Sequence, residues 1–235
     1  MSQQSHRSSN NSILAALPPA EYKRLIPHLS TVSMSKGQVL HKSDAPAAEV
    51  YFLEEGVASL SVSSDMGERM QLSIVGSESV LGERAIFKDG LFIIRCAMLT
   101  EGNGVSMPPE IFHREFDRGG KLHDLVLGRI EAGITETAQT ALCNQMHSLK
   151  ERLVRWLLTF ADRLHAEVLP ITQEAMAEMI GTTRSDISRA ATDLREAGLI
   201  KYSRGRLTLG DRRELEKKSC ECYRIIKKAL KEFTS

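Results

Sequence analysis

The amino-acid sequence predicts an α+β protein with an N-terminal antiparallel β-roll or barrel, a long helix, and a C-terminal winged helix-turn-helix. Three observations support this prediction. Short apolar segments punctuated by glycines occupy residues 31–107, an apolar repeat at three and four residues follows over 120–147, and two short amphipathic segments flank Gly181. The first pattern is typical of short strands joined by turns, and the other two are typical of helices.

The N-terminal half of the sequence contains an arm followed by a β-rich domain. Residues 1–11 are mostly Ser, Gln, Asn and charged side chains, so we expect a disordered arm there. The β-rich domain is expected over residues 12–118, and short helical turns between Ile13 and Leu29 precede its strands. The segments suited to strands are residues 37–40, 50–53, 57–62, 70–75 and 92–99.

A long dimerisation helix and a hinge are predicted over residues 119–147, because Ser148 and Glu151 form a capping box that starts a new helix. The repeat in the long helix forms a heptad seam, which is weak as a zipper because two of its members are polar. The helix either packs on its own barrel or joins two copies of the chain, and a dimer agrees better with the motif that follows. The seam consists of Leu127, Ile130, Ile134, Thr137, Ala141 and Asn144.

The C-terminal domain, expected over residues 148–235, contains a helix-turn-helix pattern in Thr172–Leu194. Apolar residues at helical spacing come before Gly181, whose lack of a Cβ permits a left-handed turn. Thr183 is placed to cap the second helix, with Asp186 three residues on reaching back toward the free N–H groups.

The second helix of this motif presents polar and basic residues on the side away from the core. In DNA-binding helix-turn-helix proteins this helix lies in the major groove, where a guanidinium pairs bidentately with O6 and N7 of guanine. The same two-helix pattern also occurs in helical proteins that never meet DNA. We expect base contacts from Arg184, Ser185, Ser188 and Arg189, and phosphate contacts from Thr172, Gln173 and Thr183.

A basic hairpin is predicted directly after the motif. Residues 199–203 and 206–209 suit two strands, with a Gly-containing turn between them. Such a hairpin is a wing, and we expect Lys201, Arg204 and Arg206 to contact phosphates of double-stranded DNA. The charge distribution agrees, because the C-terminal domain holds 18 Lys and Arg against 13 Asp and Glu, whereas the preceding residues hold 13 against 17.

Composition argues against several protein classes. The 235-residue chain is 42% hydrophobic and 26% charged, as in globular proteins of one or two domains. No apolar run is long enough to cross a membrane and no charged-then-apolar leader opens the sequence, so we expect a cytoplasmic protein without a membrane partner. No nucleophile–base pairing, phosphate-cradling loop or metal-ligand spacing resembles a catalytic site, so we expect that the protein is not an enzyme.

The four cysteines are Cys96, Cys143, Cys220 and Cys222. They lack the paired spacings of zinc and iron–sulfur sites, so we expect no metal. Cys220 and Cys222 are close enough in sequence to form a redox pair or to bind a soft metal. We favour two ordinary cysteines in a single C-terminal helix, which Asp211 caps and which ends near Phe233.

A barrel, a long helix and a winged helix-turn-helix, in this order, resemble the CRP/FNR family of bacterial transcription regulators. The resemblance covers about residues 13–230 and is most specific in IGTTRSDISRAATDLREAGLI, residues 180–200, and in the wing YSRGRLTL. In the barrel, residues 50–53 resemble an opening strand of the family and residues 82–87 resemble its ligand-cassette turn. The resemblance implies a homodimer on a palindromic operator, and RNA polymerase as a partner if the protein activates transcription.

The resemblance leaves the effector open. Cyclic-nucleotide-binding members carry a Gly-Glu pair, matched here by Gly82 and Glu83, and an Arg followed by Ser or Thr that holds the cyclic phosphate. Alignment places residues 92–93 at the second pair, and Arg95 and Cys96 follow about three positions later. A three-residue shift along a strand turns the side chain to the opposite face of the sheet. A buried phosphate without its arginine is costly, so cyclic AMP is disfavoured. The candidate effector-pocket residues are Gly82, Glu83, Arg95 and Cys96.

Other cofactors of the family depend on residues that this chain lacks or carries singly. The iron–sulfur branch needs an N-terminal cysteine cluster, and no Cys precedes Cys96, so we expect no such cluster. A haem sensor would need a histidine such as His28, His41, His113 or His123, yet lone histidines are more often satisfied groups. We therefore identify no cofactor. Three alternatives stay open: a cyclic-nucleotide-responsive activator, a regulator controlled by abundance or thiol oxidation, and a nucleotide-binding sensory module acting through a protein partner.

Overall fold

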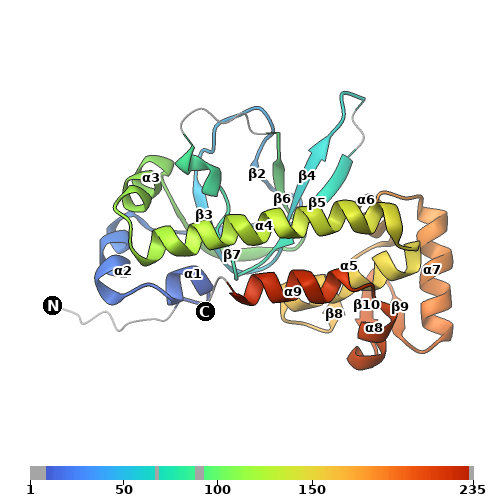
Figure 1. Ribbon diagram of the computed structural model, residues 1–235. Helices are drawn as coiled ribbons and strands as arrows, with labels where there is room; N and C mark the ends of the chain where they lie inside the picture. The colour runs from blue at the N-terminus through green and yellow to red at the C-terminus, as the bar shows by residue number, and fades with distance from the viewer. Residues whose placement is uncertain (1–8, 67–68, 88–92, 233–235) are drawn as a thin grey trace.

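The computed structural model describes residues 9–66, 69–87 and 93–232 and has three parts (Figure 1). A β-rich N-terminal part precedes the long helix α4 (Lys121–Met146), and a mainly helical C-terminal part follows it. The last helix, α9 (Cys222–Glu232), returns along α4 (Figure 1). No helix of the described segments is long and apolar enough to cross a lipid bilayer. The helices before α4 are α1 (Ser12–Ala15), α2 (Pro19–Leu25), the 3-10 helices η1 (Ile26–His28) and η2 (Glu83–Ile86), and α3 (Pro109–Asp117).

Two antiparallel sheets form the N-terminal part, which confirms the predicted β architecture. The first sheet consists, in spatial order, of β1 (Ser30–Met34), β7 (Gly102–Met107) and β3 (Val50–Glu55). The second consists of β2 (Val39–His41), β6 (Arg95–Met98), β4 (Ala58–Ser63) and β5 (Arg69–Val75). Backbone hydrogen bonds between Tyr51 and Leu81 tie the segment before η2 to the first sheet. Each of the five predicted strand segments overlaps an observed strand, but β1 and β7 were not predicted.

The glycines of β7 explain why this strand was missed. Its sequence GNGVSM begins with residues that normally mark turns. In the sheet, a Cβ at Gly104 would lie 2.2 Å from the Phe52 carbonyl oxygen, and one at Gly102 would lie 2.3 Å from the Glu55 carbonyl oxygen. Both glycines therefore permit the close backbone approach between β7 and β3.

Gly104→Ala is expected to destabilise the protein by about 1–3 kcal/mol, because the added methyl group meets backbone that cannot move aside without breaking the β3–β7 pairing. Urea denaturation measures the effect. Gly133→Ala is the matched control, since the nearest atom there is the flexible end of the Arg129 side chain, at 3.1 Å. Equal stabilities of the two variants would contradict the proposed backbone clash.

Helix α4 has one buried and one exposed face. Leu122, Leu125 and Val126 are buried against the N-terminal part. On the other face Leu127 is 45% exposed and Ile134 is 66% exposed. The remaining seam residues are also exposed or half-buried in the single chain. The barrel therefore covers the opposite face of α4 and leaves most of the seam accessible, although Ile130 packs partly against the N-terminal core.

The C-terminal part begins at the predicted capping box. The Ser148 hydroxyl accepts a hydrogen bond from the Glu151 N–H, and the Glu151 carboxylate accepts one from the Ser148 N–H at 2.9 Å. His147 lies between the two helices in extended conformation, so the chain changes direction there. The elements that follow are α5 (Leu149–Leu164), β8 (Val168–Leu169), α6 (Gln173–Ile180), α7 (Arg184–Glu196), β9 (Ile200–Ser203), β10 (Arg206–Leu209) and α8 (Arg212–Lys218).

The barrel and the C-terminal part share one apolar core. Val57 and Ile74 from the barrel belong to the same buried cluster as Phe160 of α5. The Trp156 indole N–H donates a hydrogen bond to the Gln71 side-chain oxygen at 2.7 Å, which connects α5 to β5. The two parts are therefore joined by packing and buried polar contacts as well as by the chain between them.

The expected disorder of residues 1–11 is wrong at Asn11. Its side chain is fully buried, caps α1, and donates hydrogen bonds to the carbonyl oxygens of Leu53 at 3.0 Å and Ser79 at 2.7 Å. A short polar side chain at a helix start satisfies backbone groups that apolar residues cannot. The arm prediction for residues 1–8 lies outside the described residues.

The single C-terminal helix is also wrong. Asp211 caps α8 by accepting from the Glu214 N–H at 3.1 Å, but α8 ends at Lys218 and Ser219 is extended. The chain then turns through Cys220 before α9 begins, whereas Phe233 lies outside the described residues. This break turns the two cysteines inward, and both are buried.

Candidate functional site

Threonine caps begin both helices of the helix-turn-helix. The Thr172 hydroxyl accepts a hydrogen bond from the Ala175 N–H at 3.2 Å at the start of α6. Gly181 then ends α6 with a φ of +72°, the left-handed conformation that its missing Cβ permits. The Thr183 hydroxyl accepts from the Asp186 N–H at 3.2 Å and begins α7. The local sequence therefore fixes the angle at which α7 leaves the turn.

Asp186 supports this turn differently from the expectation. Its carboxylate accepts hydrogen bonds from the Thr183 hydroxyl at 2.6 Å and the Thr182 hydroxyl at 3.1 Å, rather than from free backbone N–H groups. The bond from Thr183 and then the pairing with Arg189 lower the pKa of Asp186 to about 2. The carboxylate is therefore charged at neutral pH and holds the first turn of α7 together.

The outward face of α7 carries the residues predicted to read bases. Arg184, Ser185 and Arg189 are exposed and Ser188 is half-buried. The Arg184 guanidinium pairs with Glu174 of α6 at 2.7 Å, and the Arg189 guanidinium pairs with Asp186. Such exposed pairs are each worth about 0–1 kcal/mol, so a ligand that offers better acceptors can replace them.

The wing lies beside the start of α6. β9 and β10 pair as predicted, and β8 adds a third strand that was not expected. Arg204 and Gly205 have φ values of +49° and +74°, which gives the tight turn of a two-residue hairpin. A Cβ at Gly205 would lie 3.9 Å from the Thr172 methyl carbon, so the wing tip adjoins the α6 cap. Lys201, Arg204 and Arg206 are exposed.

The other candidate phosphate contacts lie at helix starts. Thr172 and Thr183 are exposed, and Gln173 is half-buried in the first turn of α6. Unpaired N–H groups and the helix dipole make these positions favourable for anions. The two helix starts and the wing thus offer polar and cationic groups to one elongated ligand.

A second candidate site is a cavity of about 550 Å³ between the barrel and α4. Its wall is mainly apolar and combines strands β4 and β5 with one side of α4. Four seam residues line it, namely Ile130, Ile134, Thr137 and Ala141. The cavity therefore borders the uncovered face of α4. The polar and charged side chains of its wall are Ser73, Glu83, Arg84, Arg129 and Thr137.

Of the predicted Gly-Glu pair, Glu83 lines this cavity and Gly82 does not. Gly82 has a φ of +87°, and a Cβ there would lie 3.0 Å from both the Glu49 carbonyl oxygen and His41 Nε2. Burial raises the pKa of Glu83, which follows it, although the nearby Arg129 guanidinium acts in the opposite direction. Arg129 comes from α4, and its Nε donates a hydrogen bond to the Ser79 hydroxyl. Sequence reasoning missed Arg129 because it sought the cation on a strand.

Arg95 and Cys96 do not belong to the cavity, which corrects the candidate pocket. Neither residue is part of its lining. Cys96 packs instead among the apolar side chains between the strands, where burial raises the pKa of its thiol. Phe92, aligned with the family's arginine, lies outside the described residues, and Ile93 is exposed.

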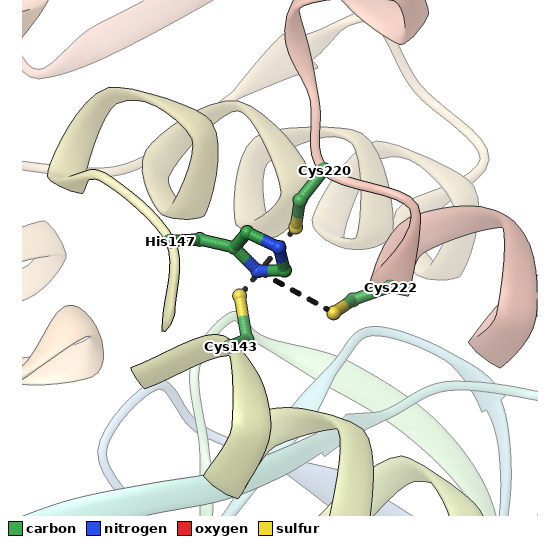
Figure 2. Close-up of side chains that lie close together, drawn as sticks. All are labelled: Cys143, His147, Cys220 and Cys222. Carbon is green, nitrogen blue, oxygen red and sulfur yellow. Dashed lines mark hydrogen bonds between the residues drawn. The ribbon is translucent and has the colours of Figure 1, made fainter. Parts of the chain in front are cut away.

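Histidine and cysteine side chains lie apart from the cavity lining. His41 is buried with its ring 5.6 Å from that of Tyr51, and burial lowers the pKa of His41 to about 4. At the hinge, three cysteines and one histidine meet: Cys143, His147, Cys220 and Cys222 (Figure 2). Sequence reasoning did not connect them because Cys143 and Cys220 are 77 positions apart.

Comparison with known proteins accounts for both parts of the chain. Residues 31–118 match the cyclic nucleotide-binding domain, and residues 151–218 match the Crp-like helix-turn-helix domain. A CRP-like cAMP-activated global transcriptional regulator of Mycobacterium tuberculosis is 20% identical over 214 residues, which cover 88% of this chain and 96% of the relative.

Solved structures show the same fold. FixK2 from Bradyrhizobium japonicum matches with a TM-score of 0.70 and 16% identity, covering 82% of this chain and 98% of that one. The c-di-GMP-responsive global regulator CLP of Xanthomonas campestris matches with a TM-score of 0.67 and 17% identity, covering 82% and 99%. With a cyclic nucleotide-binding domain, a long helix and a Crp-like helix-turn-helix in one chain, the protein belongs to the CRP/FNR family of transcription regulators.

Proposed function

We propose that this regulator acts as a homodimer that binds an inverted-repeat operator, with one α7 helix in the major groove of each half-site. The observation that carries the proposal is the uncovered N-terminal face of α7, where Arg184, Ser185 and Arg189 are exposed beside the basic wing. The accessible seam of α4 supports the dimer, because Leu127 and Ile134 would be covered by a second copy.

Each part of this surface has a distinct role in the proposal. Arg184 and Arg189 leave their carboxylate partners and pair with O6 and N7 of guanine. The α6 and α7 caps and the wing contact phosphates, which supply affinity without sequence information. Ser185 and Ser188 lie between the two arginines on the same helix and complete the base-reading face.

Arg189→Ala is expected to weaken binding to a selected operator by about 1–3 kcal/mol, or roughly 5–150-fold, and binding to random DNA much less. Fluorescence anisotropy at one fixed salt concentration gives both dissociation constants. Arg195→Ala is the matched control, because Arg195 is an exposed arginine in the last turn of the same helix. Equal losses on operator and random DNA would mean that Arg189 contacts only phosphate.

Selection of bound sequences from random DNA, with purified protein and no added ligand, tests the proposed function directly. An enriched palindrome is the expected result for a dimer that is competent without an effector. Recovery of a palindrome only after cyclic nucleotides or cell extract are added would show that an effector is required. No enrichment under either condition would contradict DNA reading by α7.

We further infer that the effector, if one exists, is not cyclic AMP. Among the residues that the structure describes, the cations lining the cavity are Arg84 of η2 and Arg129 of α4, whereas Arg95 of β6 is not part of the lining. One observation favours the alternative, a cyclic-nucleotide-responsive activator: Glu83 lines the cavity at the position of the family's ribose-binding glutamate. Isothermal titration with cyclic AMP and cyclic GMP decides between them. Micromolar binding of cyclic AMP that Glu83→Gln abolishes would overturn the inference.

A further inference from the structure

Four potential metal ligands meet at the hinge between α4 and the C-terminal part. They are Cys143 in the last turns of α4, His147 just after α4, Cys220 after α8, and Cys222 at the start of α9. Their ligand atoms all lie within 4.8 Å of one another, and their side chains point toward a common centre (Figure 2). The three cysteines are free and buried.

We propose that these residues bind a single Zn²⁺ ion with three thiolates and one imidazole. The Cys143 and Cys220 sulfurs are 3.5 Å apart, and the Cys222 sulfur is 3.7 Å from His147 Nδ1. Tetrahedral zinc, with Zn–S bonds of about 2.3 Å and Zn–N bonds of about 2.0 Å, holds its ligand atoms roughly 3.5–3.8 Å apart. These two separations therefore match those of one tetrahedral ion, and the other pairs of ligand atoms lie within 4.8 Å.

The compact spacing separates this site from other sulfur-rich centres. The cysteine ligands of a [4Fe–4S] cluster bind different irons at the corners of a cube, so they lie farther apart than ligands that share one ion. A disulfide would use Cys143 and Cys220 and leave His147 and Cys222 without a role in the group. Thiolate and imidazole together are the preferred donors of structural zinc.

The surroundings supply what a zinc site needs beyond its direct ligands. The Glu221 carboxylate lies 3.3 Å from His147 Nε2, which leaves Nδ1 directed at the three sulfurs. A carboxylate paired with the second imidazole nitrogen orients the ring and makes it a stronger donor.

The bound ion would join the end of α4 to the start of α9. Cys143 and His147 belong to the end of α4, whereas Cys220 and Cys222 begin the return of α9 along it. Beyond the site, Ile226 and Leu230 of α9 pack with Ala132 of α4. The ion thus fixes the first turn of α9 against the last turns of α4 and continues this apolar contact.

Cobalt(II) titration of the reduced, metal-free full chain tests the proposal, with metal content of the purified protein measured in parallel. The expected result is one Co²⁺ per chain with the intense visible bands of tetrahedral thiolate coordination, displaced by Zn²⁺. Cys143→Ser and Cys222→Ser should weaken cobalt binding by more than about 100-fold, and Glu221→Gln by about 10–100-fold. Cys96→Ala is the control, because Cys96 lies in the barrel core outside the group.

Thermal unfolding of the wild-type chain gives an independent measurement that does not depend on folded variants. Zn²⁺ should raise the melting temperature in proportion to the logarithm of its concentration above the dissociation constant. The proposal is overturned if the reduced chain binds no cobalt, or if Cys143→Ser and Cys222→Ser bind it as the wild type does. Formation of a Cys143–Cys220 disulfide in a chain that takes up no metal would overturn it as well.

Discussion

Ile134→Glu is expected to convert the proposed homodimer into a monomer and to weaken binding to the proposed operator by more than about 100-fold. Ile134 is 66% exposed at the middle of the accessible α4 seam. In a two-fold dimer each copy would bring its new carboxylate into the same apolar interface, where an unpaired charge is costly. A monomer reads one half-site and loses the affinity gained by binding both together.

Analytical ultracentrifugation and fluorescence anisotropy measure these two effects on the same sample. Met66→Glu is the matched control, since it makes an apolar-to-acidic change at a side chain that is 89% exposed in the segment between β4 and β5. A dimer that persists in Ile134→Glu would place the interface elsewhere, and the exposed residues of α4 would then serve only as the cavity wall.

Phe160→Ala is expected to lower the free energy of unfolding by about 3–5 kcal/mol. Phe160 is fully buried, and its ring centroid lies 5.1 Å from that of Trp156. Because Val57 and Ile74 of the barrel share this cluster, the cavity left by the substitution should loosen the barrel and the C-terminal part together. The effect on the barrel should therefore appear without any substitution there.

Urea denaturation followed by the fluorescence of the single tryptophan and by circular dichroism measures this loss. Phe87→Ala is the control, because Phe87 is 53% exposed and should lose much less. A barrel that unfolds at the wild-type urea concentration in Phe160→Ala would show that the two parts are energetically independent.

Local sequence signals predicted the helix-turn-helix and the start of α5 well. Ser148 with Glu151, Thr183 and Gly181 each have a local function that is visible within a few residues of sequence, and the structure shows each cap or turn. The strand β7 was not predicted because its glycines are required by the close approach of the β3 backbone, and β3 lies some 50 positions earlier in the sequence. Local reasoning cannot weigh a contact whose partner is so distant in the chain.

The cavity and the hinge group required the tertiary structure. Arg129 approaches Glu83 only because α4 packs along the barrel. Arg95, which alignment places about three positions from the family's arginine, lies outside the cavity. Cys220 and Cys222 looked ordinary because a continuous helix was expected, and the break at Ser219 turns both toward Cys143. The close spacing of Cys220 and Cys222 was the available signal for a metal site, but the other two ligands, Cys143 and His147, lie in another segment.

The ion pairs on the outward face of α7 bear on how the protein would search a chromosome. Arg184 and Arg189 are paired with Glu174 and Asp186, whereas no ion pair of the described residues involves the exposed wing residues Lys201, Arg204 and Arg206. On the proposed function, the wing holds the protein near the phosphates while it slides, and α7 stays indifferent to most sequences. Only a site with well-placed guanines offers acceptors that replace the carboxylates of Glu174 and Asp186. Residence time rather than encounter rate would therefore distinguish an operator from its surroundings.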